Sequence, residues 1–200
     1  MKIEVWFEFA STYSYLTVSR VEEVTQRAGV EMEWKPFLLG PIFQAKGWET
    51  SPFVLDPVKG DYMWRDMERR AERLGIPFSR PPVFPAHSLL AARVMTAALG
   101  EPWRSGFARD VFRAQFASGE DISQEVVLHR ILMAYTSNPG QWIELAQSDG
   151  VKSELRANTD QAAEIGIFGA PSFRVGNELF WGDDRLGDAV DWLKSNLYSQ

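Results

Sequence analysis

The strand-like segments of this sequence stand at its two ends, and helical patterns fill the region between them. Residues 2–9 alternate between apolar and polar side chains, which predicts a strand. A second strand is expected over residues 31–37, and two short strands over residues 172–175 and 178–181. Residues 176–177, Gly-Asn, separate the last two and predict a two-residue hairpin turn. A single sheet therefore requires the two ends of the chain to meet.

Turn and capping residues mark the expected helices. Ser11 can cap a helix that follows the first strand and ends at Gly29, so that the opening forms a βαβ unit. Residues 38–59 are rich in Gly and Pro and are expected to be a long functional loop. The other expected helices cover residues 62–74, 87–99, 102–116, 123–135 with Ser123 as its cap, a stretch from 138, 151–165, and a last helix capped by Asp184.

These elements predict an α/β chain with a thioredoxin-like fold and a large all-helical insertion. The simplest arrangement joins both ends in a four-stranded mixed sheet and places the central helices in a lobe of their own. We expect residues 1–59 and 151–200 to form the thioredoxin-like domain, and residues 60–150 the helical insertion domain. The length of 200 residues fits one domain with such an insertion.

Cysteine is absent from the sequence, which excludes disulfides, thiolate metal sites, a cysteine nucleophile and a protein dithiol redox couple. No metal site is expected. The chain has 27 acidic against 21 basic residues and no cluster of Lys or Arg, which argues against a nucleic-acid partner. Glu4 and Glu8 interrupt the apolar N-terminal segment, and no apolar stretch approaches the ~20 residues that cross a bilayer. We therefore expect a cytoplasmic protein without a membrane partner.

Ser11 lies where the first strand meets the first helix, the junction at which thioredoxin-like enzymes carry their reactive sulfur. Residues 11–14 read Ser-Thr-Tyr-Ser here, without sulfur at either end. Ser11 can be a helix cap alone, worth ~1 kcal/mol, or a functional hydroxyl. The sequence offers no base near it, because His87 and His129 both fall in the helical region.

Two segments near the C-terminus can also carry function. Pro171 follows the small Ala170 directly before a predicted strand, so their peptide bond is a candidate for the cis form. The backbone of Ala170 could then pair with an extended peptide-like ligand. The alternative is a trans proline that opens a strand. Asp183 and Asp184 are adjacent carboxylates that can accept hydrogen bonds from a ligand's ammonium group, or Asp184 can act as a helix cap alone.

Four segments stand in the order found in a known family: residues 9–16, 83–85, 168–173 and 179–186. They read Phe-Ala-Ser-Thr-Tyr-Ser-Tyr-Leu, Val-Phe-Pro, Phe-Gly-Ala-Pro-Ser-Phe and Leu-Phe-Trp-Gly-Asp-Asp-Arg-Leu. On these motifs the chain resembles the 2-hydroxychromene-2-carboxylate isomerases, relatives of the kappa-class glutathione transferases, over nearly its whole length. The resemblance implies a homodimeric, glutathione-dependent enzyme that acts on a small aromatic substrate.

The resemblance also implies roles for single residues. Ser11 would hold the glutathione thiol, and the backbone of Ala170, before a cis Pro171, would pair with the cysteinyl part. Thr12 departs from the family pattern Ser-Pro-Tyr-Ser, and Trp48 stands where relatives carry an asparagine. The residues expected at the two ends of glutathione are Gly182, Asp183 and Asp184 for the γ-glutamyl group and Lys59 for a carboxylate.

A hydroxyl at position 11 can stabilise a thiolate without a base. Lowering the pKa of a thiol by ~2 units requires ~2.7 kcal/mol. A charge-assisted hydrogen bond from Ser11 contributes ~1.5–3 kcal/mol, and a helix N-terminus ~0.3–1 kcal/mol, or up to ~2 kcal/mol when partly buried. Ser11 is therefore expected to donate to sulfur and not to act as a nucleophile.

We expect the chain to catalyse an isomerisation in which glutathione thiolate adds to an aromatic hydroxy-keto acid, a bond rotates, and the thiolate leaves. The many Trp and Phe residues would form the apolar wall for this substrate. Two alternatives stay open. One is a kappa-like glutathione transferase that conjugates electrophiles. The other is a redox-inactive thioredoxin-fold module that binds an extended peptide at Ala170 and Pro171.

Overall fold

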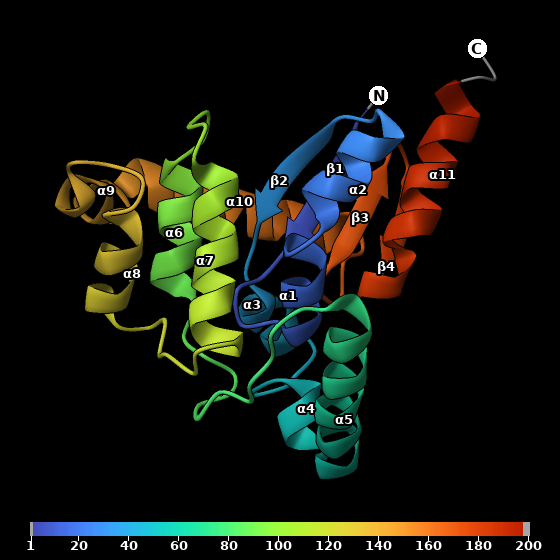
Figure 1. The fold of residues 1–200 in the computed structure, drawn as a ribbon, viewed down its shortest axis with the longest axis horizontal. Helices are drawn as coiled ribbons and strands as arrows, with labels where there is room; N and C mark the ends of the chain where they lie inside the picture. The colour runs from blue at the N-terminus through green and yellow to red at the C-terminus, as the bar shows by residue number, and fades with distance from the viewer. Residues whose placement is uncertain (1, 198–200) are drawn as a thin grey trace.

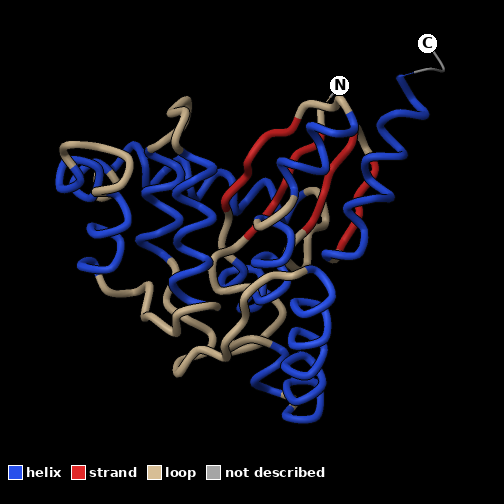
Figure 2. Tube along the Cα trace, in the orientation of Figure 1, coloured by secondary structure: helices blue, strands red, loops and turns tan. Residues whose placement is uncertain are grey.

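The two ends of the chain meet in one sheet (Figures 1 and 2). The computed structural model describes residues 2–197. Its strands follow the order β2-β1-β3-β4. β1 (Ile3–Phe7) runs parallel to β2 (Met32–Pro36) and antiparallel to β3 (Ser172–Val175), and β3 pairs antiparallel with β4 (Glu178–Trp181). The expected four-stranded mixed sheet is therefore confirmed.

Both faces of the central strand β1 are buried. Ile3, Val5 and Phe7 point into the larger of two hydrophobic clusters. Trp6 points to the opposite face, where its ring meets the edge of Phe37 at a centroid distance of 6.0 Å. β1 is thus covered on both sides, which makes it a rigid support for the turn that follows it.

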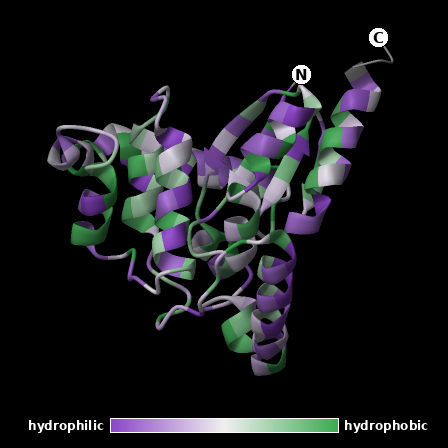
Figure 3. Ribbon diagram, in the orientation of Figure 1, coloured by the Kyte–Doolittle hydropathy of each residue, from purple (hydrophilic) through white to green (hydrophobic). Residues whose placement is uncertain are grey.

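Helices cover both faces of the sheet. The larger cluster includes residues of α1, α2 and α11, and the smaller one includes residues of α3. α10 contributes to both, with Leu155 in the larger cluster and Ala162 in the smaller one. The bounds of these helices are α1 (Thr12–Val18), α2 (Val21–Ala28), α3 (Leu39–Ala45), α10 (Asp149–Glu164) and α11 (Leu186–Leu197). In Figure 3, purple bands alternate with green along α11, as expected for a helix that buries one face.

The remaining helices lie beside and below the sheet in Figure 1. The larger cluster also contains Phe107 and Phe112 of α7, so the helical region and the sheet share one core. The division at residues 59/60 and 150/151 stays a prediction, and both boundaries fall in the first turn of a helix. The bounds are α4 (Pro52–Leu55), α5 (Pro57–Leu74), α6 (Leu89–Ala97), α7 (Arg104–Phe116), α8 (Glu125–Leu132) and α9 (Pro139–Leu145).

No helix within residues 2–197 has both the length and the apolar character needed to cross a membrane.

The single helix expected after Ser11 is wrong, because the structure divides it into α1 and α2. The hydroxyl of Ser19 donates to the carbonyl oxygen of Tyr15 at 2.8 Å, so this side chain satisfies a backbone carbonyl at the end of α1. Arg20 then leaves the helical conformation, with φ −138° and ψ −12°, and its guanidinium reaches Asp183 at 2.6 Å. The break between α1 and α2 thus coincides with a tertiary contact to a residue 163 positions away in the sequence.

The long loop expected over residues 38–59 is also wrong, since α3, α4 and the start of α5 lie in it. Pro52 and Pro57 stand at the first positions of α4 and α5, where proline favours a helix. Ser51 and Asp56 cap these helices through their side chains. The prolines that indicate a loop in the sequence are here the residues that begin helices.

Two expected caps are wrong, and one is confirmed. α8 begins after Gln124, and Ser123 lies before it in a turn held by the carboxylate of Asp121. Asp184 lies inside a 3₁₀ helix, η1 (Asp183–Arg185), and α11 begins only at Leu186. Ser11 caps α1, where its hydroxyl accepts from the backbone N–H of Ser14 at 3.2 Å.

Candidate functional site

A cavity of about 670 Å³ opens at the carboxyl end of β1. Its wall combines residues 8–13 of the turn after β1 with residues 38–53 around α3 and α4. Residues 84–89 before α6 and residues 168–170 before β3 complete it, together with Trp181. Four segments that are far apart in the sequence therefore meet at this cavity, whose volume is typical of a small-molecule site.

Ser11 and Ala170 touch in the wall of this cavity. The hydroxyl of Ser11 donates to the carbonyl oxygen of Ala170 at 2.8 Å, across 159 positions of sequence. The peptide bond between Ala170 and Pro171 is cis, the form that the family resemblance implies and that the residues alone left open. Ser11 therefore both caps α1 and contacts the bend before β3, so the structural and the functional interpretations of this residue are compatible.

The backbone N–H of Ala170 has no hydrogen-bond acceptor within the part of the chain that the structure describes. Ala170 lines the cavity and is 8% exposed. A buried N–H group without a partner carries an energetic penalty that a ligand carbonyl can remove. The N–H of Ala170 is therefore available to a carbonyl oxygen of an extended, peptide-like ligand.

Close packing holds the bend before β3 in place. A Cβ atom on Gly169 would lie 2.4 Å from Nε1 of Trp181, so only glycine lets the indole approach. The ring of Trp181 also contacts Phe168, with 4.7 Å between centroids. The N–H of Gly182 donates to the carbonyl oxygen of Pro171 at 3.0 Å, which ties the segment after β4 to the same bend.

The two expected aspartates have different surroundings. The side chain of Asp183 is fully buried, and its carboxylate accepts from Thr17 at 2.9 Å and from both Arg20 and Arg70 at 2.6 Å. It connects α1, the α1–α2 junction and α5. The carboxylate of Asp184 is about half exposed, with Oδ2 3.4 Å from Nη2 of Arg185. Asp184 is therefore the member of the pair whose carboxylate solvent can reach.

Lys59 lines the cavity from the first turn of α5. Its side chain is 66% exposed, and its ammonium nitrogen lies 3.9 Å from the carboxylate of Asp56. The structure thus places Lys59, Ser11 and Ala170 on one cavity. Gly182, Asp183 and Asp184 follow Trp181 in the chain, and none of the three is among the residues that line the cavity.

Glu8 is a residue of the cavity that sequence reasoning missed. It is 6% exposed, and its Oε1 atom accepts from the N–H of Ala10 at 3.1 Å and from the hydroxyl of Ser88. Burial raises the pKa of Glu8 from its ordinary value of 4.5 to about 7. The sequence contains one signal for it, a carboxylate within an apolar run three positions before Ser11.

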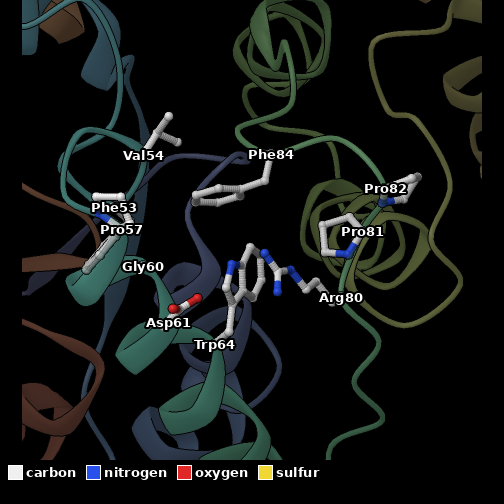
Figure 4. Close-up of a pocket in the computed structure, with 10 residues that line it drawn as sticks. All are labelled: Phe53, Val54, Pro57, Gly60, Asp61, Trp64, Arg80, Pro81, Pro82 and Phe84. Carbon is white, nitrogen blue, oxygen red and sulfur yellow. The ribbon is translucent and has the colours of Figure 1, made fainter.

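A second, smaller cavity of about 350 Å³ adjoins the first (Figure 4). Phe53 and Phe84 line both cavities. The guanidinium carbon of Arg80 lies 4.7 Å from the ring centroid of Trp64, and the ring of Phe84 meets the indole edge-on at 4.8 Å. Phe84 precedes a second cis proline, Pro85. Phe84 and Pro85 of the motif Val-Phe-Pro thus line the larger cavity.

The chain is similar to known proteins over nearly its whole length. The model of the DSBA-like thioredoxin domain matches residues 2–194. The 2-hydroxychromene-2-carboxylate isomerase of Sphingobium xenophagum is 26% identical over 197 residues, covering 98% of this chain and 97% of that protein. Glutathione S-transferase kappa 1 of Caenorhabditis elegans is 26% identical over 207 residues, with coverages of 96% and 91%.

A solved structure of a 2-hydroxychromene-2-carboxylate isomerase has the same fold, with a TM-score of 0.89 and 23% identity over 100% of this chain and 97% of that one. The resemblance inferred from the sequence motifs is therefore confirmed, and so is the thioredoxin-like fold with additional helices. Since the domain model spans nearly the whole sequence, the chain belongs to the family of DSBA-like thioredoxin domains.

Proposed function

We propose that this protein is a glutathione-dependent isomerase of the 2-hydroxychromene-2-carboxylate type. The observation that carries the proposal is the 2.8 Å contact between the hydroxyl of Ser11 and the carbonyl of Ala170 in the wall of a ligand-sized cavity. A hydroxyl at this position can replace the cysteine that the chain lacks, provided that a ligand brings the sulfur. Relatives named as isomerases and as kappa glutathione transferases support the choice of glutathione.

The residues of the cavity suggest how the tripeptide would be held. The free N–H of Ala170 would pair with the cysteinyl backbone. Lys59 offers a cation and Asp184 a solvent-accessible carboxylate, which suit the carboxylate and ammonium groups at the ends of glutathione. When bound, glutathione supplies a thiol whose anion can add reversibly to a conjugated double bond.

Ser11 stabilises that anion by turning its hydroxyl from Ala170 toward the sulfur. The charge-assisted hydrogen bond contributes ~1.5–3 kcal/mol. α1 has only seven residues, so we assign most of the stabilisation to this hydrogen bond and less to the helix dipole. The apolar wall, which includes Phe53, Phe84 and Phe168, excludes water and suits an aromatic substrate.

Replacing Ser11 by alanine tests this role. With saturating glutathione and an aromatic hydroxy-keto acid, we expect S11A to lower kcat by roughly 10- to 100-fold, which corresponds to the loss of the hydrogen bond. Ser19→Ala is the matched control, because the hydroxyl of Ser19 bonds within α1 and does not line the cavity. A rate for S11A within about threefold of the parent would remove Ser11 from the mechanism.

A kappa-like transferase is the second candidate, favoured by the match to the kappa transferase of Caenorhabditis elegans. Turnover with substoichiometric glutathione separates the two reactions. An isomerase leaves the total thiol concentration unchanged over many turnovers, whereas a transferase consumes one thiol per product. Calorimetric titration with glutathione tests the third possibility, since a module that binds only protein segments releases no heat with it.

A further inference from the structure

Glu8 places a carboxyl group in the wall of the cavity, and no cation within residues 2–197 forms an ion pair with it. Both of its hydrogen bonds, from Ala10 and from Ser88, go to the same oxygen, Oε1. The other oxygen, Oε2, has no hydrogen-bond partner among residues 2–197. Glu8 is 6% exposed and lines the cavity. A buried carboxyl at such a position that keeps one oxygen free of hydrogen bonds can exchange a proton with a bound molecule.

The protonation of Glu8 follows from its surroundings. Burial raises its pKa to about 7, and the hydrogen bonds from Ser88 and Ala10 oppose this rise by stabilising the carboxylate. The other ionisable groups that line the cavity are Tyr13, Glu49, Lys59 and the exposed His87, and none of them contributes to the shift. Near neutral pH the neutral and the ionised forms of Glu8 are therefore both available.

We propose that Glu8 carries the proton of the isomerisation, an inference that rests on the function proposed above. Bound glutathione would supply a thiolate, and its addition to the conjugated system would move an electron pair onto the carbonyl oxygen of the substrate. The neutral Glu8 carboxyl donates its proton from Oε2 to that oxygen, so one O–H bond breaks and another forms. When the thiolate leaves, the electron pair returns and Glu8 takes the same proton back. Neither proton nor electron is consumed.

Electrostatics favours this division of roles. Ser11 stabilises the thiolate, and a second negative charge in the same apolar cavity would repel it. A neutral Glu8 avoids this repulsion before addition. After addition the sulfur is no longer charged, so an ionised Glu8 no longer meets this repulsion. The active form for the forward reaction is therefore the protonated one, and kcat should fall as the pH rises past the titration of Glu8.

The experiment combines a spectroscopic titration with a pH profile. NMR of ¹³C-labelled glutamate in the glutathione-free protein follows the Glu8 carboxyl, and Glu8→Gln assigns its signal. We expect the midpoint near pH 7 in the parent to coincide with the alkaline limb of kcat. The pH profile of E8Q should lack this alkaline limb. The kcat of this variant should be lower than that of the parent by at least roughly 100-fold, as expected for the loss of a general acid. The affinity of E8Q for glutathione, measured by calorimetry, should stay within threefold of that of the parent.

Ser88→Ala distinguishes proton transfer from a structural role. Removing the hydrogen bond that stabilises the carboxylate should raise the NMR midpoint and move the alkaline limb upward by the same amount. Thr96→Val is the control, because the buried hydroxyl of Thr96 bonds within α6, outside the cavity. His87→Asn excludes the imidazole as the source of the limb.

The outcomes separate the two proposals. Three outcomes overturn the role of Glu8 and leave the proposed function intact. In these outcomes the alkaline limb of kcat keeps its position in S88A, is still present in E8Q, or is absent in H87N. A parent protein that releases no heat with glutathione overturns the proposed function, and this inference with it.

Discussion

Replacing Asp183 by asparagine tests whether this residue supports the site or binds the ligand. Asparagine has nearly the same shape, but it leaves the guanidinium groups of Arg20 and Arg70 without their carboxylate. The Asp183 side chain is fully buried, while those of Arg20 and Arg70 are 23% and 28% exposed. Removing one partner of a buried ion pair lowers the free energy of unfolding by roughly 3–5 kcal/mol. Because both arginines are partly exposed, we expect D183N to lose about 3 kcal/mol, at the lower end of this range.

Urea denaturation followed by tryptophan fluorescence measures this loss. In a chain of this length, about 3 kcal/mol corresponds to a decrease in Tm of roughly 6–12 °C. Asp184→Asn is the matched control, because its carboxylate is half exposed. D184N should change stability by less than about 0.5 kcal/mol and weaken glutathione binding. The reasoning is refuted if D183N unfolds within about 1 kcal/mol of the parent while its affinity for glutathione falls tenfold.

Three further predictions follow from single contacts. Gly169→Ala should lose ~1–3 kcal/mol of stability in urea, because its Cβ would lie 2.4 Å from Trp181 Nε1, whereas Gly140→Ala, with open space around it, should lose none; equal stability of the two would contradict the packing. Glu8 keeps its proton up to about pH 7 in the fold but only to 4.5 when unfolded, so stability should fall by about 3 kcal/mol as the pH rises through this window. E8Q should flatten that slope in pH-dependent urea titrations, and an unchanged slope would assign it to another group. Lys59→Met should weaken glutathione binding by up to roughly fivefold at low salt and have little effect at high salt, as measured by calorimetry; a salt-independent loss would argue against an exposed ion pair.

The sheet could be predicted because its signals are local. The apolar alternation of residues 2–9 and the turn residues 176–177 are patterns among neighbours in the sequence. The strand β1 and the hairpin of β3 and β4 form where these patterns predict them. The helices of residues 38–59 could not be predicted in this way. Pro52 and Pro57 have the same appearance in a loop and at a helix start, and only the packing around α3 to α5 decides between them.

In the candidate site too, some residues could be predicted from the sequence and others could not. Ser11 and Ala170 follow from motif and topology, because a mixed sheet brings the end of β1 beside the start of β3. The burial of Asp183 depends on Arg20 and Arg70, which lie 163 and 113 positions away. The role proposed for Glu8 depends on its burial and on its contact with Ser88, 80 positions away, and the sequence signals it only as a carboxylate within an apolar run.

The contact between Ser11 and Ala170 spans most of the chain, and this has a consequence for biosynthesis. A nascent polypeptide that has already produced β1, α1 and all helices up to α10 still lacks one wall of the cavity. Translation must deliver the hairpin of β3 and β4 beyond the ribosomal exit tunnel before any tripeptide can be captured. Stalled ribosome complexes that display only the first 165 residues should therefore retain no glutathione on an affinity resin, however long they are incubated.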